Sequence, residues 1–507
     1  MKKIYAAVLI VLMSGLAIAE TGIAITEKRL ANGDSEITVD NTIGKIKKTY
    51  KINLSKHYEP ATERNAAIKK WESYKFGAFF SFNDNQFDGR EWSQNKDPEL
   101  FNPPSLDVDN WVATFKNAAM KFALLTVKHT SEFLLYDSPT TEHDVANSGY
   151  RHDIVKEFVE KCRANGIVPA IYYCPTPYGR GERTVMLAQL YELATGYGDI
   201  DYFWIDMPNW FPADLTVQEV YDMLKDINPD GIVLFNMRNH MKGEGKIVHW
   251  PTDVVNGEST LPNSNGYSPW RMVNGKRYYV PFDFEMCSQT VTEDAFVPAG
   301  ISYSSKPVTW FTYGEGKGFR VSKTFTAEEM YPFIATAYRL GAGCAMLSCA
   351  PDWTGKFRED DAGELARLGE MLRDPSKAPA NPVTLNCEAT GSSTNNHEFD
   401  YAPSRAVDGH PLSFWAPATI PAWLEVHLDR ARTVGSVLLD ERAKAMVKKF
   451  EVQAFVNGKW NTILKGEKIA LAERFTIKPV TAKKFRLKIL EGDVGVHIHE
   501  FQLFEKN

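Results

Sequence analysis

Acidic residues recur in this sequence directly after short apolar runs. Asp206 follows the run 202–205, Glu258 closes an Asn-Gly-Glu stretch, and Glu285 lies inside the run 282–286. Hydrolysis of a glycosidic bond uses two carboxyl groups that flank the bond, one as a proton donor and the other as a nucleophile or base. Asp206 is the best single candidate for such work, although an aspartate that caps the following helix would fit its spacing equally well.

Eight short apolar runs alternate with amphipathic stretches over residues 75–372. Between the runs, apolar residues recur at three- and four-residue intervals, as on one face of a helix. The alternation predicts an α/β fold and favours a (β/α)8-type barrel, whose working residues lie at the carboxyl ends of its strands. An open doubly wound sheet would give the same alternation. The expected strands are 76–82, 122–127, 167–173, 202–205, 231–235, 282–286, 308–311 and 344–347.

The sequence changes character at a proline-rich stretch over 375–382. Such a stretch is typical of a linker. Beyond it, short alternating segments such as 423–428, 434–440, 450–456 and 484–489 predict an antiparallel β-sandwich. We therefore expect a lead-in segment over 20–74, a barrel over 75–374, a linker over 375–382 and an all-β sandwich over 383–507.

The amino terminus has the order of a secretory signal. Two lysines precede an apolar stretch that ends in Ala17-Ile18-Ala19, so we expect a signal peptide over 1–19 and an exported protein, periplasmic or secreted. No later stretch is long and apolar enough to span a membrane. A net charge of −6 argues against a nucleic acid as partner.

Several motifs within residues 75–372 occur in the order seen in one family of enzymes. Together they resemble the barrel of the α-L-fucosidases of glycoside hydrolase family 29. No single motif decides the resemblance, and the order of all of them carries it. The matching stretches are 75–79, 87–92, 97–103, 125–133, 341–347 and 352–355.

The resemblance implies a retaining exo-glycosidase that removes a terminal α-L-fucosyl or similar sugar from glycans without a cofactor. By position, Asp206 matches the family's nucleophile. Glu258 is the first choice for the acid/base and Glu285 the second, because the loop that carries this residue varies in length within the family. An inverting hydrolase on the same scaffold would need its carboxyl groups further apart.

The resemblance also implies a set of sugar-contacting residues, and the sequence departs from the family's pattern nearby. Ser81 and Thr130 stand where family members usually carry histidines. This departure leaves two alternatives open: a glycosidase for a related α-L-sugar, or a catalytically impaired relative that binds glycans. The implied contacts are Glu91, Trp92, His129, Trp204 and Arg238.

A second resemblance covers the carboxy-terminal part. Stretches 406–409, 414–415, 423–428 and 498–504 are similar to a discoidin-type or family 32 carbohydrate-binding module. In that family the aspartate of the Asp-Gly turn often helps to bind a structural calcium, which identifies Asp408 as a candidate ligand. A plain Asp-Gly turn explains the same residue, and His497 and His499 share a strand face without a visible third metal ligand.

Overall fold

Eight parallel strands form the central sheet of the protein. The computed structural model describes residues 22–90, 92–93, 95–236, 247–258, 261–262, 266–291, 308–313, 322–395, 401–410, 413–441, 445–469 and 473–506. The strand order is β8-β7-β6-β5-β4-β16-β12-β9. In chain order these strands are β4 (Phe76–Phe80), β5 (Phe122–Lys128), β6 (Val168–Tyr173), β7 (Tyr202–Ile205), β8 (Ile232–Phe235), β9 (Val255–Glu258), β12 (Phe282–Cys287) and β16 (Ala342–Cys349).

The two ends of this strand order, β8 and β9, meet and bring the sheet close to a closed barrel. The Asp253 N–H donates to the Val233 carbonyl at 2.9 Å, and the Val233 N–H donates to the Asp253 carboxylate at 3.0 Å. Asp253 thus ties the chain leading into β9 to the middle of β8, and we call this junction the seam. The predicted α/β barrel is confirmed.

One expected strand was assigned wrongly. The run at 308–311 contributes β14 (Val308–Thr309), which pairs with β13 (Gln289–Val291) in a small antiparallel sheet that also contains β15 (Ser322–Thr324). The missing barrel strand is β9, whose sequence Val-Asn-Gly-Glu has a single large apolar residue. Hydropathy therefore could not identify it as a buried strand, and Glu258 lies on a strand, not in a loop.

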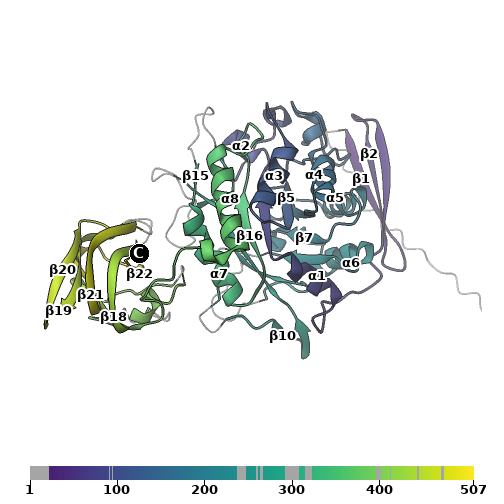
Figure 1. Ribbon diagram of the computed structural model, residues 1–507. Coiled ribbons are helices and arrows are strands. Elements are labelled where there is room, and N and C mark those ends of the chain that lie inside the picture. Colours follow the sequence, from purple (N-terminus) through teal and green to yellow (C-terminus); the bar gives the residue numbers. More distant parts are fainter. Residues whose placement is uncertain are drawn as a thin grey trace, which may run out of the picture.

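Helices cover the outside of the barrel (Figure 1). Asp107 and Asp153 cap the first turns of two of them with their side chains, and Thr216 and Thr326 form capping boxes at two more. The helices are α3 (Val108–Asn117), α4 (Ile154–Ala164), α5 (Arg183–Gly196), α6 (Val217–Ile227), α7 (Ala327–Arg339) and α8 (Glu359–Arg373).

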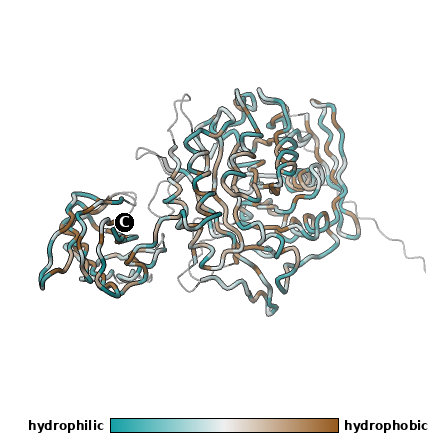
Figure 2. The backbone as a smooth tube through the Cα atoms, viewed as in Figure 1, coloured by the Kyte–Doolittle hydropathy of each residue, from teal (hydrophilic) through white to brown (hydrophobic). Residues whose placement is uncertain are grey.

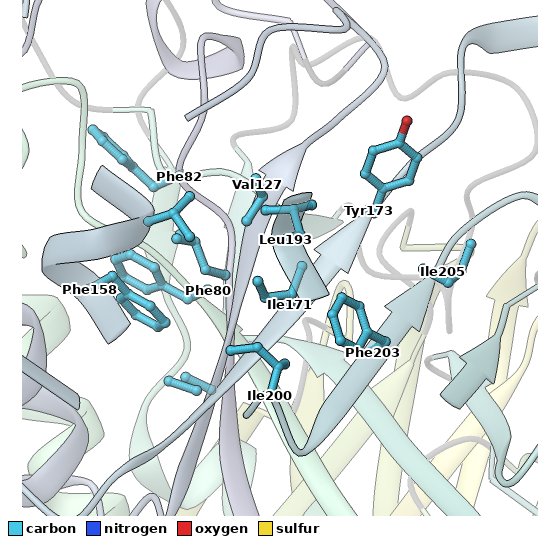
Figure 3. Close-up of a cluster of buried hydrophobic side chains, with 14 of the residues drawn as sticks. Phe80, Phe82, Val127, Phe158, Ile171, Tyr173, Leu193, Ile200, Phe203 and Ile205 are labelled. Atoms are coloured by element: carbon cyan, nitrogen blue, oxygen red, sulfur yellow. The ribbon is translucent and has the colours of Figure 1, made fainter. Parts of the chain in front are cut away.

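Strand residues alternate between this helical layer and the barrel interior. Figure 3 shows Ile171 and Phe203 among the outward-facing side chains, with Phe158 of α4 and Leu193 of α5 in the same cluster. The alternate positions on the same strands point inward and include Tyr172 and Trp204. This alternation directs Asp206, the next inward position directly after β7, into the mouth of the barrel.

The segment before the barrel is ordered. Strands β1 (Ile23–Arg29), β2 (Ser35–Asn41) and β3 (Ile46–Ile52) form an antiparallel sheet, from which the Tyr50 hydroxyl donates to Glu192 of α5. Helix α1 (Ala66–Tyr74) adds Ile68 and Trp71 to the interior core of the barrel. The expected lead-in therefore packs against the barrel at both places.

The carboxy-terminal domain is antiparallel, as expected. Its strand order is β17-β18-β21-β19-β20, and β22 also pairs with β18. Hydrophobic and hydrophilic segments alternate along its chain, as they do in the barrel (Figure 2), and the apolar residues form a separate core. The strands are β17 (Glu388–Gly391), β18 (Ala422–Glu441), β19 (Val447–Val456), β20 (Lys459–Gly466), β21 (Glu473–Gly492) and β22 (Ile498–Glu505).

Candidate active site

One asparagine joins two of the predicted catalytic carboxylates. Asn236 directly follows β8, and its Nδ2 donates to Oδ1 of Asp206 and to Oε2 of Glu258, at 3.0 Å in each case. The two carboxylate oxygens therefore lie no further apart than twice that distance. Asp206 directly follows β7 and Glu258 ends β9, so the seam brings together two residues that are 52 positions apart in the sequence.

Asp206 accepts further hydrogen bonds that orient its carboxylate. The Tyr172 hydroxyl donates to Oδ2 at 2.6 Å, and the Met207 N–H donates to Oδ1 at 2.9 Å. Burial and the negative charge of Glu258 raise the pKa of Asp206 to about 6, and the bonds from Tyr172 and Asn236 oppose that rise. The carboxylate is ionised at neutral pH, with its oxygens held in fixed directions.

Glu285 lies beside this pair on the neighbouring strand. In the parallel register of β12 and β9, Glu285 is opposite Glu258, and its Oε2 accepts from Asn256 Nδ2 at 3.0 Å. Burial first, and then the charge of Glu258, raises the pKa of Glu285 well above its usual value. With 1% of its surface exposed, against 8% for Glu258, Glu285 is the less accessible of the two acid/base candidates.

His129 follows β5 at the same end of the barrel and is neutral. Its ring stacks on Tyr172 with centroids 5.8 Å apart, and burial lowers its pKa to about 3. Its Nδ1 lies 3.2 Å from the Thr130 hydroxyl, so Thr130 contacts the histidine at this site. Ser81 is fully buried and lies 3.3 Å from the Ser348 hydroxyl of β16. Thr130 thus contacts a predicted site residue, and Ser81 directly follows β4 at the carboxyl end of that strand.

Aromatic side chains flank the nucleophile candidate. Trp92 meets Trp210 edge to face at 5.5 Å, and Trp210 contacts Tyr178 at 5.3 Å. Trp210 lies four residues after Asp206, and Tyr178 is 67% exposed. Trp204 is instead 1% exposed and stacks on Tyr172 inside the barrel, so it supports the site from below.

Two predicted contact residues, Glu91 and Arg238, lie outside the described residues. Conversely, the sequence analysis gave no role to Tyr172, Asn236 or Asn256. Each occupies an inward position at or near a strand end, which is the one signal in the sequence that could have identified them.

The calcium candidate Asp408 is close to a carboxylate that the sequence analysis missed. Oδ1 of Asp408 accepts from the His410 N–H at 2.9 Å and from the Ser413 hydroxyl at 2.8 Å, and Arg405 pairs with Oδ2 at 3.3 Å. Both carboxylate oxygens of Glu500 are buried without a hydrogen-bond partner among the described residues. Burial and the charge of Asp408 raise the pKa of Glu500 well above its usual value.

A hard divalent cation would satisfy these buried oxygens. Within the described ranges, no group of three or more histidine, cysteine, aspartate or glutamate side chains is arranged to hold a metal ion. Asp408 and Glu500 would therefore need backbone carbonyl oxygens as further ligands, which calcium accepts readily.

Comparison with known proteins matches both domains. Residues 47–279 match the family model described as Alpha-L-fucosidase, and residues 388–501 match the F5/8 type C domain. A putative alpha-L-fucosidase 1 of Oryza sativa subsp. japonica is 24% identical over 452 residues, which cover 83% of this chain and 80% of that protein. Alpha-L-fucosidase 1 of Arabidopsis thaliana is 23% identical over 367 residues, which cover 69% of this chain and 67% of that protein.

Solved structures of similar fold include two bacterial proteins. A putative alpha-L-fucosidase from Bacteroides thetaiotaomicron is 20% identical, with a TM-score of 0.47, over 89% of this chain and 98% of that one. A GH29 fucosidase from Ruminococcus gnavus, in complex with fucose, is 16% identical, with a TM-score of 0.47, over 90% of this chain and 98% of that one.

A parallel barrel with paired carboxylates at the carboxyl ends of its strands, together with the matching family models, defines a glycoside hydrolase, and its substrates are glycans. Over most of its barrel the chain matches the Alpha-L-fucosidase family model, and its carboxy-terminal part matches the F5/8 type C (discoidin) domain. Both resemblances seen in the sequence are confirmed. No helix in the described part of the chain is long and apolar enough to cross a membrane.

Proposed function

We propose that this protein is a retaining exo-α-L-fucosidase that removes a terminal α-L-fucosyl residue from a glycan, with Asp206 as nucleophile and Glu258 as acid/base. The observation that carries the proposal is the bridge that Asn236 makes between the two carboxylates. The names of the plant and bacterial relatives support fucose as the sugar.

In the first step, an oxygen of Asp206 attacks the anomeric carbon and the glycosidic C–O bond breaks. Glu258 transfers its proton to the departing oxygen, and the sugar is left bound to Asp206 through an ester. In the second step, Glu258 takes a proton from water, the water oxygen attacks the same carbon, and the Asp206 carboxylate leaves. Two inversions at one carbon give net retention.

The separation of the two carboxylates supports retention over inversion. Retaining enzymes place their carboxyl groups ~5–5.5 Å apart, and inverting enzymes ~6.5–9.5 Å apart. Both oxygens are 3.0 Å from the same Asn236 nitrogen, so Oδ1 of Asp206 and Oε2 of Glu258 are at most about 6 Å apart, which is compatible with the retaining geometry.

Neutral groups are available to receive the sugar's hydroxyls. His129 is uncharged at neutral pH and lies over Tyr172, the residue that orients the nucleophile. The smaller Ser81 and Thr130 leave fewer imidazole partners than family members usually offer. A related α-L-sugar, or glycan binding without turnover, is the second candidate function because of these two residues.

Hydrolysis of a panel of aryl α-L-glycosides tests the proposal. We expect turnover of the α-L-fucoside with retention of the anomeric configuration. NMR of the sugar anomer that forms first measures this configuration. Asp206→Ala should abolish turnover, and added azide should restore part of it, because a small anion can attack from the vacated side. If the protein turned over no α-L-glycoside yet bound fucosylated glycans by calorimetry, the binding function would replace the proposed one.

We further propose that the protein is exported, on the basis of the signal-like order of residues 1–19, which lie outside the described residues. In the F5/8 type C domain, Asp408 and Glu500 would hold a structural calcium, which would neutralise the buried carboxylate of Glu500 and the half-buried one of Asp408 and so stabilise the domain. The burial of both Glu500 oxygens, which have no well-formed hydrogen bond within the described part of the chain, supports this proposal.

A further inference from the structure

A turn of the F5/8 type C domain contacts the barrel four residues after the proposed acid/base along the chain. His410 is 7% exposed, although it lies in a loop of the sandwich, and its Nε2 lies 3.0 Å from the Pro262 carbonyl oxygen. Pro262 follows Glu258 by four residues along the chain. The two domains therefore meet at Pro262, in the chain that follows β9 and the proposed acid/base.

The contact has a defined direction. A carbonyl oxygen can only accept, so Nε2 of His410 carries the hydrogen and donates it. Pro262 has no N–H of its own, and its carbonyl is its one hydrogen-bonding group.

Both partners of this bond are themselves held in place. The backbone N–H of His410 donates to Asp408 at 2.9 Å, and Gly409 occupies the left-handed region with a φ of 65°. On the barrel side, Leu261 is 5% exposed and packs in the barrel's outer core. The bond thus joins a fixed turn in one domain to a buried anchor in the other.

A second bond between the domains supplies an internal comparison. The Thr336 hydroxyl of α7 donates to the Gly409 carbonyl at 3.2 Å, and α7 lies on the side of the barrel that faces the sandwich (Figure 1). This bond fastens the same turn to a helix and not to the chain after β9. Loss of either bond weakens the contact between the two domains. Of the two bonds, the one from His410 is made to the chain that follows Glu258.

We propose that His410 is a positioning residue, through which the carboxy-terminal domain holds the chain after β9 and thereby keeps Glu258 directed at the departing oxygen. The inference builds on the proposed function, in which Glu258 supplies the proton. It makes the F5/8 type C domain part of the catalytic unit and not only an attached module.

The test compares His410→Leu, His410→Gln and Thr336→Val in the full chain. Glutamine reproduces an N–H donor at about the reach of Nε2, whereas leucine fills similar space without one. For each variant, kcat/KM is measured on aryl α-L-fucosides whose phenols differ in pKa. A misplaced proton donor slows poor leaving groups more than good ones.

We expect His410→Leu to lose roughly 2- to 10-fold in kcat/KM on the poorest leaving group and little on the best, as for loss of one neutral hydrogen bond. His410→Gln and Thr336→Val should keep the leaving-group dependence of the unmutated protein. The inference would be overturned if kcat/KM depended on the pKa of the leaving phenol equally in His410→Leu and in the unmutated protein. It would also be overturned if Thr336→Val steepened this dependence as much as His410→Leu. Either result would leave the proposed function unaffected.

Hydrogen exchange separates this inference from the proposed function. If the unmutated protein turns over no α-L-fucoside, the proposed function fails. The exchange rates of the amides of Val255–Glu258 and Leu261 then still test whether His410 holds this segment. Their exchange should be faster in His410→Leu than in Thr336→Val. Equal exchange in the two variants would show that His410 does not hold this segment.

Discussion

Removal of one hydroxyl from the barrel interior should shift the pH dependence of the enzyme. Tyr172 donates to Asp206 at 2.6 Å, and its ring also stacks on Trp204 and His129. Tyr172→Phe keeps the ring contacts and deletes only the hydrogen bond. Because that bond favours the ionised carboxylate, its loss raises the pKa of Asp206 further above its present value of about 6.

The size of the shift follows from the strength of the bond. A hydrogen bond to a charged group is worth about 1.5–3 kcal/mol, and one pKa unit corresponds to about 1.36 kcal/mol. The expected shift is therefore about one to two units. Asp206 must be ionised to attack, so activity rises as the pH passes its pKa, and the acid limb of kcat/KM should move from near pH 6 to roughly 7–8.

The assay is the pH profile of kcat/KM on one activated aryl α-L-fucoside, whose acid limb reports the apparent pKa of Asp206. Tyr202→Phe is the matched control, because the Tyr202 hydroxyl donates to Asp283 deeper in the barrel at 2.5 Å. The control should leave the limb in place. An unmoved limb in Tyr172→Phe, or an equal movement in both variants, would refute the assignment of Asp206 as the titrating nucleophile.

Three further predictions concern the proton donor, the rim and the calcium site. Glu258→Ala should slow substrates with poor leaving groups far more than activated ones, and if Glu285→Ala alone showed this pattern, Glu285 would be the acid/base. Tyr178→Ala should raise KM for an oligosaccharide more than for an aryl fucoside, since the exposed ring offers a stacking surface near the leaving sugar; equal KM changes on both substrates would contradict this. Calcium should raise the midpoint of thermal unfolding, because a ligand that binds only the folded state stabilises it. Glu500→Gln should remove that rise, and an unchanged calcium response in the variant would exclude Glu500 as a ligand.

The sequence allowed most of the barrel to be predicted, because buried parallel strands are continuous apolar runs. The strand at 202–205 was predicted with its observed bounds. The search for apolar runs did not identify β9, because polar residues that face the site replace the apolar pattern there. Burial of Asn256 and Glu258 depends on partners from β8 and β12, and no local pattern encodes those neighbours.

The candidate site was predictable to a similar extent. Asp206 could be identified from the sequence, because it directly follows the apolar run 202–205, which predicts a strand. The role of Tyr172 depends on the register of β6 against β7, and the isolation of Glu500 depends on how the sandwich folds around it. Both are tertiary facts, so the residue types alone could not reveal them.

The seam between β8 and β9 has a consequence for how this lineage can change. Asn236 bridges the proposed catalytic pair, Asp206 and Glu258, and its bond to Glu258 also ties the chain after β8 to β9, the two ends of the strand order. A descendant under relaxed selection that lost Glu258 would therefore lose turnover and weaken barrel closure in one mutation. Evolution towards a protein that only binds glycans through loss of Glu258 would thus also destabilise the fold. A change of this kind should begin instead at residues such as Ser81 and Thr130, which shape sugar contacts without closing the barrel.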